Sequence, residues 1–167
     1  LEEINTFFES IGEKKFRAKQ VHEWLWQKHA HSFGDMTNLS KELRQKLGEI
    51  FTLPALTVDA TQYSSDGTVK SRFRTHEGHL IEGVLIPTDE RKTACVSSQI
   101  GCSLSCKFCA TGYIDRKRNL NFDEIYDEVV LINQQSEKVY EKKLTNIVFM
   151  GMGEPLLNYK NVMKAIE

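Results

Sequence analysis

The first fifty residues alternate hydrophobic and polar positions with the period of an α-helix. Apolar residues recur at helical spacing from Ile4 to Ile11, and Gly12 ends the run. The same pattern predicts a second helix over 17–30 and a third over about 40–50, with Ser40 at the N-cap. Three short helices predict a small helical accessory domain over residues 1–52.

After Pro54 the period changes from that of a helix to that of a strand. Residues 55–63 are rich in Thr and Val, and the run Ser65-Asp66-Gly67 is typical of a hairpin turn. Residues 69–75 then alternate apolar with basic side chains, and 79–86 form a further strand. The pattern predicts a small antiparallel β linker of about three strands over residues 53–92.

The remaining residues repeat a strand, a loop and a helix twice. A strand at 93–98 precedes a helix that begins at Asn121, where Glu124 completes a capping box. A second strand at 145–150 precedes a helix that Asn158 is expected to cap. This order is typical of a parallel α/β barrel.

The predicted fold class is therefore α/β. Residues 93–167 supply the first two βα units of a partial (β/α) barrel, of which a full barrel has about eight. In such folds, ligands bind beyond the carboxyl ends of the strands. Because one loop follows each strand there, we expect the loop of residues 101–109 and that of residues 151–155 to open side by side.

Composition narrows the class of protein without identifying it. The net charge is −1 and 40% of residues are hydrophobic, which suits a globular core. No apolar run approaches the roughly 18 residues of a membrane span and no signal peptide opens the chain, so we predict a soluble, cytoplasmic monomer without membrane contact. The chain begins at Leu1 rather than Met, which we interpret as a fragment of a longer protein.

Three of the four cysteines lie within eight residues, in a C-x3-C-x2-C run: Cys102, Cys106 and Cys109. Three thiolates can hold three irons of a [4Fe–4S] cluster and leave the fourth iron open, whereas electron carriers use four. The alternative is structural zinc, which takes four ligands. Cys95 or a histidine, His76 or His79, could be the fourth.

These motifs resemble those of the radical S-adenosylmethionine (SAM) superfamily: the Cys-x3-Cys-x-Phe-Cys run after one strand and Gly-Met-Gly-Glu-Pro after the next. The wider runs Cys95-Val-Ser-Ser-Gln-Ile-Gly-Cys and Met-Gly-Met-Gly-Glu-Pro-Leu-Leu-Asn are similar to those of the dual-specificity RNA (adenine-C2)-methyltransferases. The resemblance extends over essentially the whole chain.

The resemblance implies the cofactors and their ligands. A [4Fe–4S] cluster held by the three cysteines binds SAM at its open iron, Gly153 and Glu154 contact the methionyl amino group, and Phe108 lies near the adenine. An electron from a donor such as flavodoxin cleaves SAM to a 5′-deoxyadenosyl radical.

The resemblance also implies the substrates and the route. The enzyme methylates C2 of an adenine in 23S rRNA and in tRNA through a methylated cysteine that lies outside this chain. Cys95 resolves the covalent protein–RNA adduct, and the two cysteines end as a disulfide. A radical route suits C2, because this electron-poor carbon does not attack the methyl group of SAM. From the residues alone, the preferred interpretation of Cys95 is a small buried apolar side chain.

Glu82 shares a strand face with Leu80, Val84 and Ile86, and we expect it to point inward. The family has a proton-accepting Glu at the matching position, and burial can raise the pKa of a carboxyl toward that of a base. The alternative is a solvated carboxylate on an exposed sheet.

Two other functions stay open. One is a related radical SAM enzyme that methylates C8 of adenine in rRNA; Pro155 after Glu154 favours the C2 group. The other is a zinc-bearing RNA-binding module without catalysis. RNA contact itself is consistent with three basic clusters, at 14–19, 70–74 and 116–118.

Overall fold

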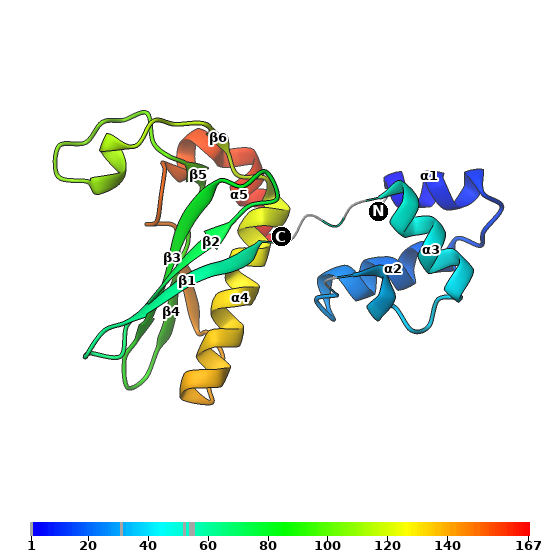
Figure 1. The fold of residues 1–167 in the computed structure, drawn as a ribbon, viewed down its shortest axis with the longest axis horizontal. Coiled ribbons are helices and arrows are strands. Elements are labelled where there is room, and N and C mark those ends of the chain that lie inside the picture. Colours follow the sequence, from blue (N-terminus) through cyan, green and yellow to red (C-terminus); the bar gives the residue numbers. More distant parts are fainter. Residues whose placement is uncertain (1, 31, 52, 54–55) are drawn as a thin grey trace. The chain divides into compact units, whose positions relative to one another are not determined.

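The computed structural model describes residues 2–30, 32–51, 53 and 56–167. The chain divides into two compact units, Leu1–Leu53 and Pro54–Glu167. Figure 1 shows a helical first unit and a second unit built from a sheet and helices.

The first unit contains helices α1 (Glu2–Ser10), α2 (Phe16–Trp26) and α3 (Lys41–Ile50), with a short 3-10 helix η1 (Phe33–Asp35) before the last. The predicted N-cap at Ser40 is confirmed, since its side chain accepts a hydrogen bond from Leu43 N at 3.2 Å. The prediction that the second helix continues to residue 30 is wrong. The helix ends at Trp26, and His29 takes a left-handed turn with φ of 52°. The core of the unit consists of Phe8, Ala18, Val21, Met36, Leu39, Leu43 and Leu47.

The second unit is organised around one five-stranded sheet in the order β1-β2-β3-β4-β7. Its first three pairs are antiparallel, and β4 and β7 are parallel. The strands are β1 (Thr57–Tyr63), β2 (Val69–Arg74), β3 (Leu80–Pro87), β4 (Lys92–Cys95) and β7 (Asn146–Val148). The remaining elements are β5 (Gln99–Ile100) paired with β6 (Arg118–Asn119), helices α4 (Phe122–Tyr140) and α5 (Tyr159–Ile166), and 3-10 helices η2 (Ala110–Tyr113) and η3 (Pro155–Asn158).

The three antiparallel strands expected over 53–92 are present, but they continue directly into the α/β part. β3 pairs with β4, with Val84 opposite Cys95, so residues 53–92 and 93–167 share one sheet within a single unit rather than forming a linker and a separate domain. Pairing β3 with β4 satisfies backbone groups that a free three-stranded sheet would leave at its edge.

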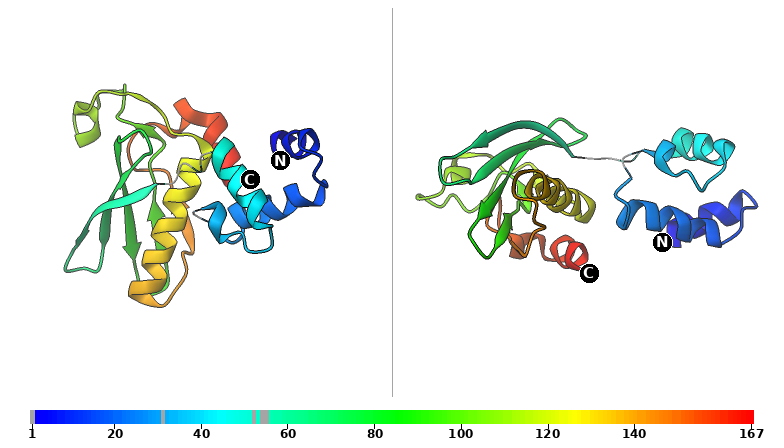
Figure 2. Two further views of the ribbon diagram at one scale, coloured as in Figure 1. Left: turned by 45° about the vertical axis from the view of Figure 1, so that its right-hand side comes forward. Right: turned by 90° about the horizontal axis from the view of Figure 1, so that it is seen from below.

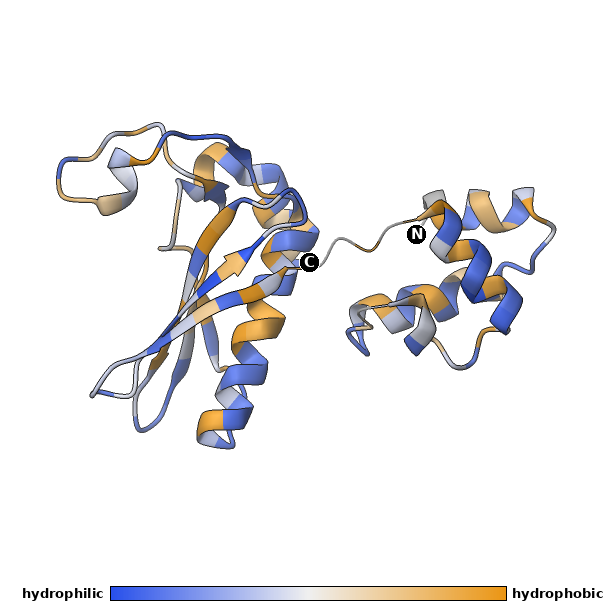
Figure 3. Cartoon of the chain, viewed as in Figure 1, coloured by the Kyte–Doolittle hydropathy of each residue, from blue (hydrophilic) through white to orange (hydrophobic). Residues whose placement is uncertain are grey.

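Helix α4 covers one face of this sheet (Figures 1 and 2) and carries alternating hydrophobic and polar residues (Figure 3). Asn121 begins the helix with the predicted capping box, in which Asn121 N donates to Glu124 Oε2 at 2.8 Å. The helix buries Ile125 and Ile132 against the sheet. The facing residues are Val69, Phe73, Ile81, Leu85 and Ala94 on the strands and Val96 directly after β4.

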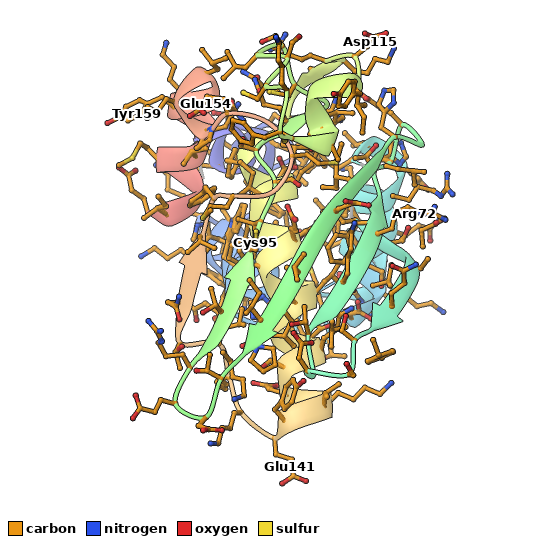
Figure 4. All side chains as sticks on the ribbon, turned by 90° about the vertical axis from the view of Figure 1, so that its left-hand side faces the viewer. Arg72, Cys95, Asp115, Glu141, Glu154 and Tyr159 are labelled. Atoms are coloured by element: carbon orange, nitrogen blue, oxygen red, sulfur yellow. The ribbon has the colours of Figure 1, made fainter. Side chains whose placement is uncertain are left out.

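The other face of the sheet has no helix over it among the residues that the structure describes (Figure 4). Cys95 on β4 and Glu82 on β3 share this face, because Cys95 lies opposite Val84 and Glu82 is two residues from Val84. No described helix is both long enough and apolar enough to cross a membrane.

Candidate functional site

Two loops leave the carboxyl ends of the parallel strands β4 and β7. We call residues 102–114 the cysteine loop and residues 151–158 the glycine loop. Figure 4 shows Asp115 and Glu154 at one end of the sheet and Glu141 at the other. The segment after β4 is bonded to the glycine loop: Ser98 N and Gln99 N donate to Met152 O at 2.9 and 3.1 Å. The prediction that the two loops open side by side is confirmed.

Ser97 joins four elements at the base of these loops. Its hydroxyl donates to Glu82 O on β3 at 2.7 Å and accepts from Met152 N at 2.9 Å. Its backbone N–H lies 3.0 Å from both carboxyl oxygens of Glu128 on α4. Glu128 is fully buried, and burial raises its pKa well above the ordinary value. Neither Ser97 nor Glu128 belongs to a recognisable motif, although Glu128 lies three residues after Ile125 and thus on the helix face that packs on the sheet.

The prediction that the side chain of Asn158 caps the last helix is wrong. Asn158 occupies the N-cap position of α5 but makes no side-chain capping bond. Its amide instead donates to Ser98 O and to Leu120 O, both at 2.8 Å, so it ties the end of the glycine loop to segments on both sides of the cysteine loop.

Gly153 and Glu154 occupy a tightly fixed part of the glycine loop. Gly153 has φ of +92°, and a Cβ atom there would lie 2.4 Å from Gln99 Cβ. Glu154 N donates to Gln99 Oε1 at 3.0 Å, and Glu154 Oε1 accepts from Leu156 N at 3.2 Å. Glycine at 153 is therefore required both by backbone conformation and by close packing.

The cysteine loop is bonded mainly to itself. Cys102 N donates to Ile114 O at 3.2 Å, and Cys109 N donates to Cys106 O at 3.0 Å. All three cysteines are free thiols of intermediate exposure. Phe108 is 94% exposed, so nothing in the described chain packs on its ring.

The thiols of the cysteine loop suit metal ligation by their chemistry. The backbone N–H groups of Thr111 and Gly112 bond to the Cys109 sulfur and lower the pKa of its thiol, which favours the thiolate that binds iron. Across the described residues, no three Cys, His, Asp or Glu side chains are gathered closely enough to hold a metal ion. By the chemistry of their thiols the three cysteines fit a cluster with three cysteine ligands, and the loop would have to close to bring them around it.

Cys95 lies in the middle of the sheet on β4 (Figure 4), opposite Val84 and Val148, with 8% of its surface exposed. Burial raises the pKa of its thiol, partly offset by a hydrogen bond from Met150 N. This environment favours a neutral thiol, as expected of a cysteine that is not a metal ligand.

The expectation that Glu82 points into the core is wrong. The buried positions of β3 are Ile81, Gly83 and Leu85, whereas Glu82 is about half exposed on the opposite face. There its carboxylate forms an ion pair with Lys70 Nζ at 2.8 Å. The alternation on β3 was predicted, but the sequence could not tell which face α4 would cover.

The basic side chains of strand β2 form ion pairs with carboxylates on the neighbouring strands β1 and β3. Arg72 and Arg74 both bind Asp59 on β1, and hydrogen bonds from Arg74 and then Arg72 lower the pKa of that carboxyl. With Lys70 paired to Glu82, the three cations face two carboxylates, which leaves one net positive charge on this group.

Comparison with known proteins agrees with this architecture. Residues 1–53 match the family model described as the ribosomal RNA large subunit methyltransferase N-terminal domain, and residues 96–167 match that of the radical SAM superfamily. A solved structure described as a radical SAM methyltransferase from Sphaerobacter thermophilus superposes with a TM-score of 0.86 at 38% identity, covering 99% of this chain and 48% of that one. The fold is therefore that of the radical SAM class, and the predicted fold class is confirmed.

The most similar curated proteins that we compared carry a more specific name. The chain is 60% identical over 166 residues to a protein of Cytophaga hutchinsonii named probable dual-specificity RNA methyltransferase RlmN. The matched region covers 99% of this chain and 46% of that protein. It is 44% identical over 167 residues to the dual-specificity RNA methyltransferase RlmN of Geotalea uraniireducens, covering 100% of this chain and 47% of that protein. The chain is thus similar to the N-terminal part of such methyltransferases, which confirms the resemblance predicted from its motifs. It spans about half the length of the curated relatives that it matches.

Proposed function

We propose that the protein containing this chain is a radical SAM methyltransferase that methylates C2 of an adenine in 23S rRNA and in tRNA. The observation that carries the proposal is the direct hydrogen bonding of the segment before Cys102 to the Gly153–Glu154 loop, at the carboxyl ends of two parallel strands. Ligands of α/β folds bind at this edge. The names of the most similar relatives support the same activity.

In this proposal Cys102, Cys106 and Cys109 hold a [4Fe–4S] cluster, which when bound would supply the electron that cleaves SAM. The bonds to the Cys109 sulfur stabilise its thiolate. Glu154 presents an anionic carboxylate suited to the ammonium group of SAM, and Phe108 offers a free aromatic face for its adenine.

Cys95 and Glu82 are the proposed catalytic residues, because they share the open face of the sheet. After losing its proton, Cys95 would attack the sulfur of the second cysteine in the covalent adduct with the RNA; the S–S bond forms, the S–C bond breaks, and the released carbon takes up a proton. Glu82 would accept the proton lost from C2. Its ion pair with Lys70 occupies one carboxylate oxygen and would have to open for that oxygen to accept the proton.

The partners follow from the same chemistry. The helical unit is the proposed RNA-binding module, the electron comes from a donor such as flavodoxin, and the protein acts as a cytoplasmic monomer. The target adenine must leave its stack to reach the site, as in other enzymes that modify bases.

The test is mass analysis of adenosines from RNA treated anaerobically with the full-length protein, SAM and a reductant. The expected product is 2-methyladenosine from both 23S rRNA and tRNA. Cys95→Ala is expected to accumulate a covalent protein–RNA adduct instead of product, whereas replacement of the other cysteine traps none.

The rival functions give different results in the same preparation. Methylation at C8 would identify the related rRNA enzymes, and colourless protein with one zinc per chain and no sulfide would identify an RNA-binding module. If Cys95→Ala trapped no adduct while the wild type formed product, the resolving role of Cys95 would be lost but the activity would stand.

A further inference from the structure

Gln99 lies on β5, three residues before Cys102, and its side chain is completely buried. Its backbone N–H donates to Met152 O at 3.1 Å, and its side-chain Oε1 accepts from Glu154 N at 3.0 Å. A single residue thus fixes two positions of the glycine loop while its own chain continues into the cysteine loop.

The amides of Gln99 and Asn119 form a hydrogen-bonded chain whose direction is determined at both ends. Gln99 Nε2 donates to Asn119 Oδ1 at 2.7 Å, and Asn119 Nδ2 donates to Leu157 O at 3.3 Å. Because Glu154 N can only donate, Gln99 must present Oε1 to it; because Leu157 O can only accept, Asn119 must present Nδ2. The two requirements agree, so neither amide can flip without opposing like groups.

This chain connects three segments of the site. In the glycine loop, Glu154 is the N-cap of η3 and Leu157 lies within η3. Gln99 precedes the cysteine loop. Asn119 follows the cysteine loop on β6, where its Oδ1 also accepts from an Arg116 N–H at 2.9 Å. Both stems of the cysteine loop are therefore attached to the glycine loop through two side-chain amides.

We propose that Gln99, acting through Asn119, is a positioning residue that keeps the Gly153–Glu154 backbone at a fixed separation from the cysteine loop. The inference rests on the proposed function, in which these two loops bind SAM and the cluster respectively. Gln99 touches neither reacting group; it sets where the SAM-binding backbone lies.

If Gln99 only filled space, an apolar side chain of similar size could replace it without loss. Gln99 Cβ and Cγ would lie 2.4 and 2.6 Å from a Cβ at 153, so the side chain certainly fills space here. Leucine fills much of the same volume without polar atoms, and would satisfy a packing role while leaving Glu154 N without its acceptor. The variant that separates the two roles is therefore Gln99→Leu.

The matched control is Gln135→Leu. Gln135 also uses its amide in a partly buried pair, with Ser71 Oγ at 2.7 and 3.1 Å, but that pair lies between α4 and β2. The substitution Gln135→Leu therefore removes the same chemical group, a side-chain amide, from the same unit without touching either loop.

Two measurements on the full-length protein test the proposal. In cluster-free protein, Gln99→Leu is expected to speed hydrogen exchange at the Glu154 amide about tenfold, while Gln135→Leu leaves it unchanged. In reconstituted protein with unchanged iron and sulfide per chain, Gln99→Leu is expected to weaken SAM binding about tenfold, measured from the change that SAM causes in the electron paramagnetic resonance spectrum of the reduced cluster.

Asn119→Leu supplies a second, milder test, because Asn119 is only half-buried. It is expected to weaken SAM binding by a smaller factor, and to add little when combined with Gln99→Leu, since both act through one hydrogen-bonded chain. If exchange at Glu154 and SAM affinity match the wild type in Gln99→Leu, the inference is overturned. If the wild type itself binds no SAM, the proposed function fails, and the exchange experiment still decides whether Gln99 holds the loop.

Discussion

The glycine loop and the cysteine loop leave neighbouring strands at the same edge, but they are held in different ways. The glycine loop is bonded to the rest of the sheet unit along its length, by Val96, Ser97, Ser98, Gln99 and Asn119. The hydrogen bonds described for residues 102–114 stay within that loop, and its large apolar side chains are exposed: Leu104, Phe108, Tyr113 and Ile114.

The difference indicates what each loop depends on. The protein alone fixes the glycine loop, so the proposed SAM-binding backbone is formed before any ligand arrives. The cysteine loop has fixed stems, and a cluster with three thiolate ligands would supply the cross-links that its own sequence lacks. Metal binding that orders a segment in this way contributes its free energy to folding.

The largest expected effect comes from removing one thiolate. Cys106→Ala is expected to reduce cluster iron and sulfide to background in anaerobically reconstituted full-length protein, because two cysteines cannot hold three irons. In the wild type, reconstitution should slow hydrogen exchange in residues 102–114 by more than about tenfold and leave residues 151–158 within about twofold. Mass spectrometry of exchanged peptides measures both.

Cys95→Ala is the matched control, since Cys95 is a buried thiol on β4 outside the loop. It should retain the full cluster content. Equal slowing of exchange in the two loops on reconstitution would contradict the comparison.

A smaller expected effect compares the cost in unfolding free energy of replacing one glycine in each loop. Gly153→Ala places a Cβ 2.4 Å from Gln99 Cβ at a backbone φ of +92°. It should lower the free energy of unfolding by about 3 kcal/mol, from left-handed strain together with overpacking. Urea unfolding of the cluster-free protein measures it.

Gly112→Ala is also crowded, though less so, since its Cβ would lie 2.7 Å from Cys106 O and its φ is not positive, and its three nearest neighbours all belong to the cysteine loop. That loop can shift as a whole, so we expect a loss below about 1 kcal/mol in the cluster-free protein. A cost for Gly112→Ala as large as that for Gly153→Ala would show that the cysteine loop is already rigid without a cluster.

The elements of this fold were predictable wherever their signal is local. The capping box of Asn121 and Glu124 spans four residues, and the alternation in β2 predicts a strand with one buried face. The boundary drawn between 92 and 93 had another cause. The pattern there changes because β4 lies between β3 and β7 and buries three of its four residues, whereas β3 alternates buried with more exposed positions. The change marks burial within one sheet, not a new domain.

The polar residues that hold the site were less predictable. Gln99 and Asn119 lie on either side of the cysteine motif in the sequence, but no local pattern indicates that one amide bonds the other across twenty residues. Asn158 fits the composition of an N-cap, and only the tertiary structure offers its amide two buried carbonyls. Side chains that bond distant backbone need the fold before their partners can be known.

Glu128 tests the support beneath the glycine loop. Its carboxyl is buried under Ser97, which in turn holds Met152, and burial raises its pKa well above the ordinary value. The folded state therefore favours the protonated carboxyl. Between the unfolded pKa and the folded pKa, unfolding releases a proton, so stability declines as pH rises through this window, by about 1.4 kcal/mol for each unit of the shift.

Glu128→Gln is expected to remove this decline while keeping the bond from Ser97 N, because the amide resembles the protonated acid in shape. Wild type and variant should have similar unfolding free energies near pH 5, and the variant should be the more stable at pH 8. Glu137→Gln on the exposed side of the same helix should leave the pH dependence unchanged. Urea unfolding at the two pH values measures all three proteins. Parallel pH profiles for wild type and Glu128→Gln would mean that the buried carboxyl is ionised in the folded protein, and that Ser97 N–H stabilises its charge more than burial opposes it.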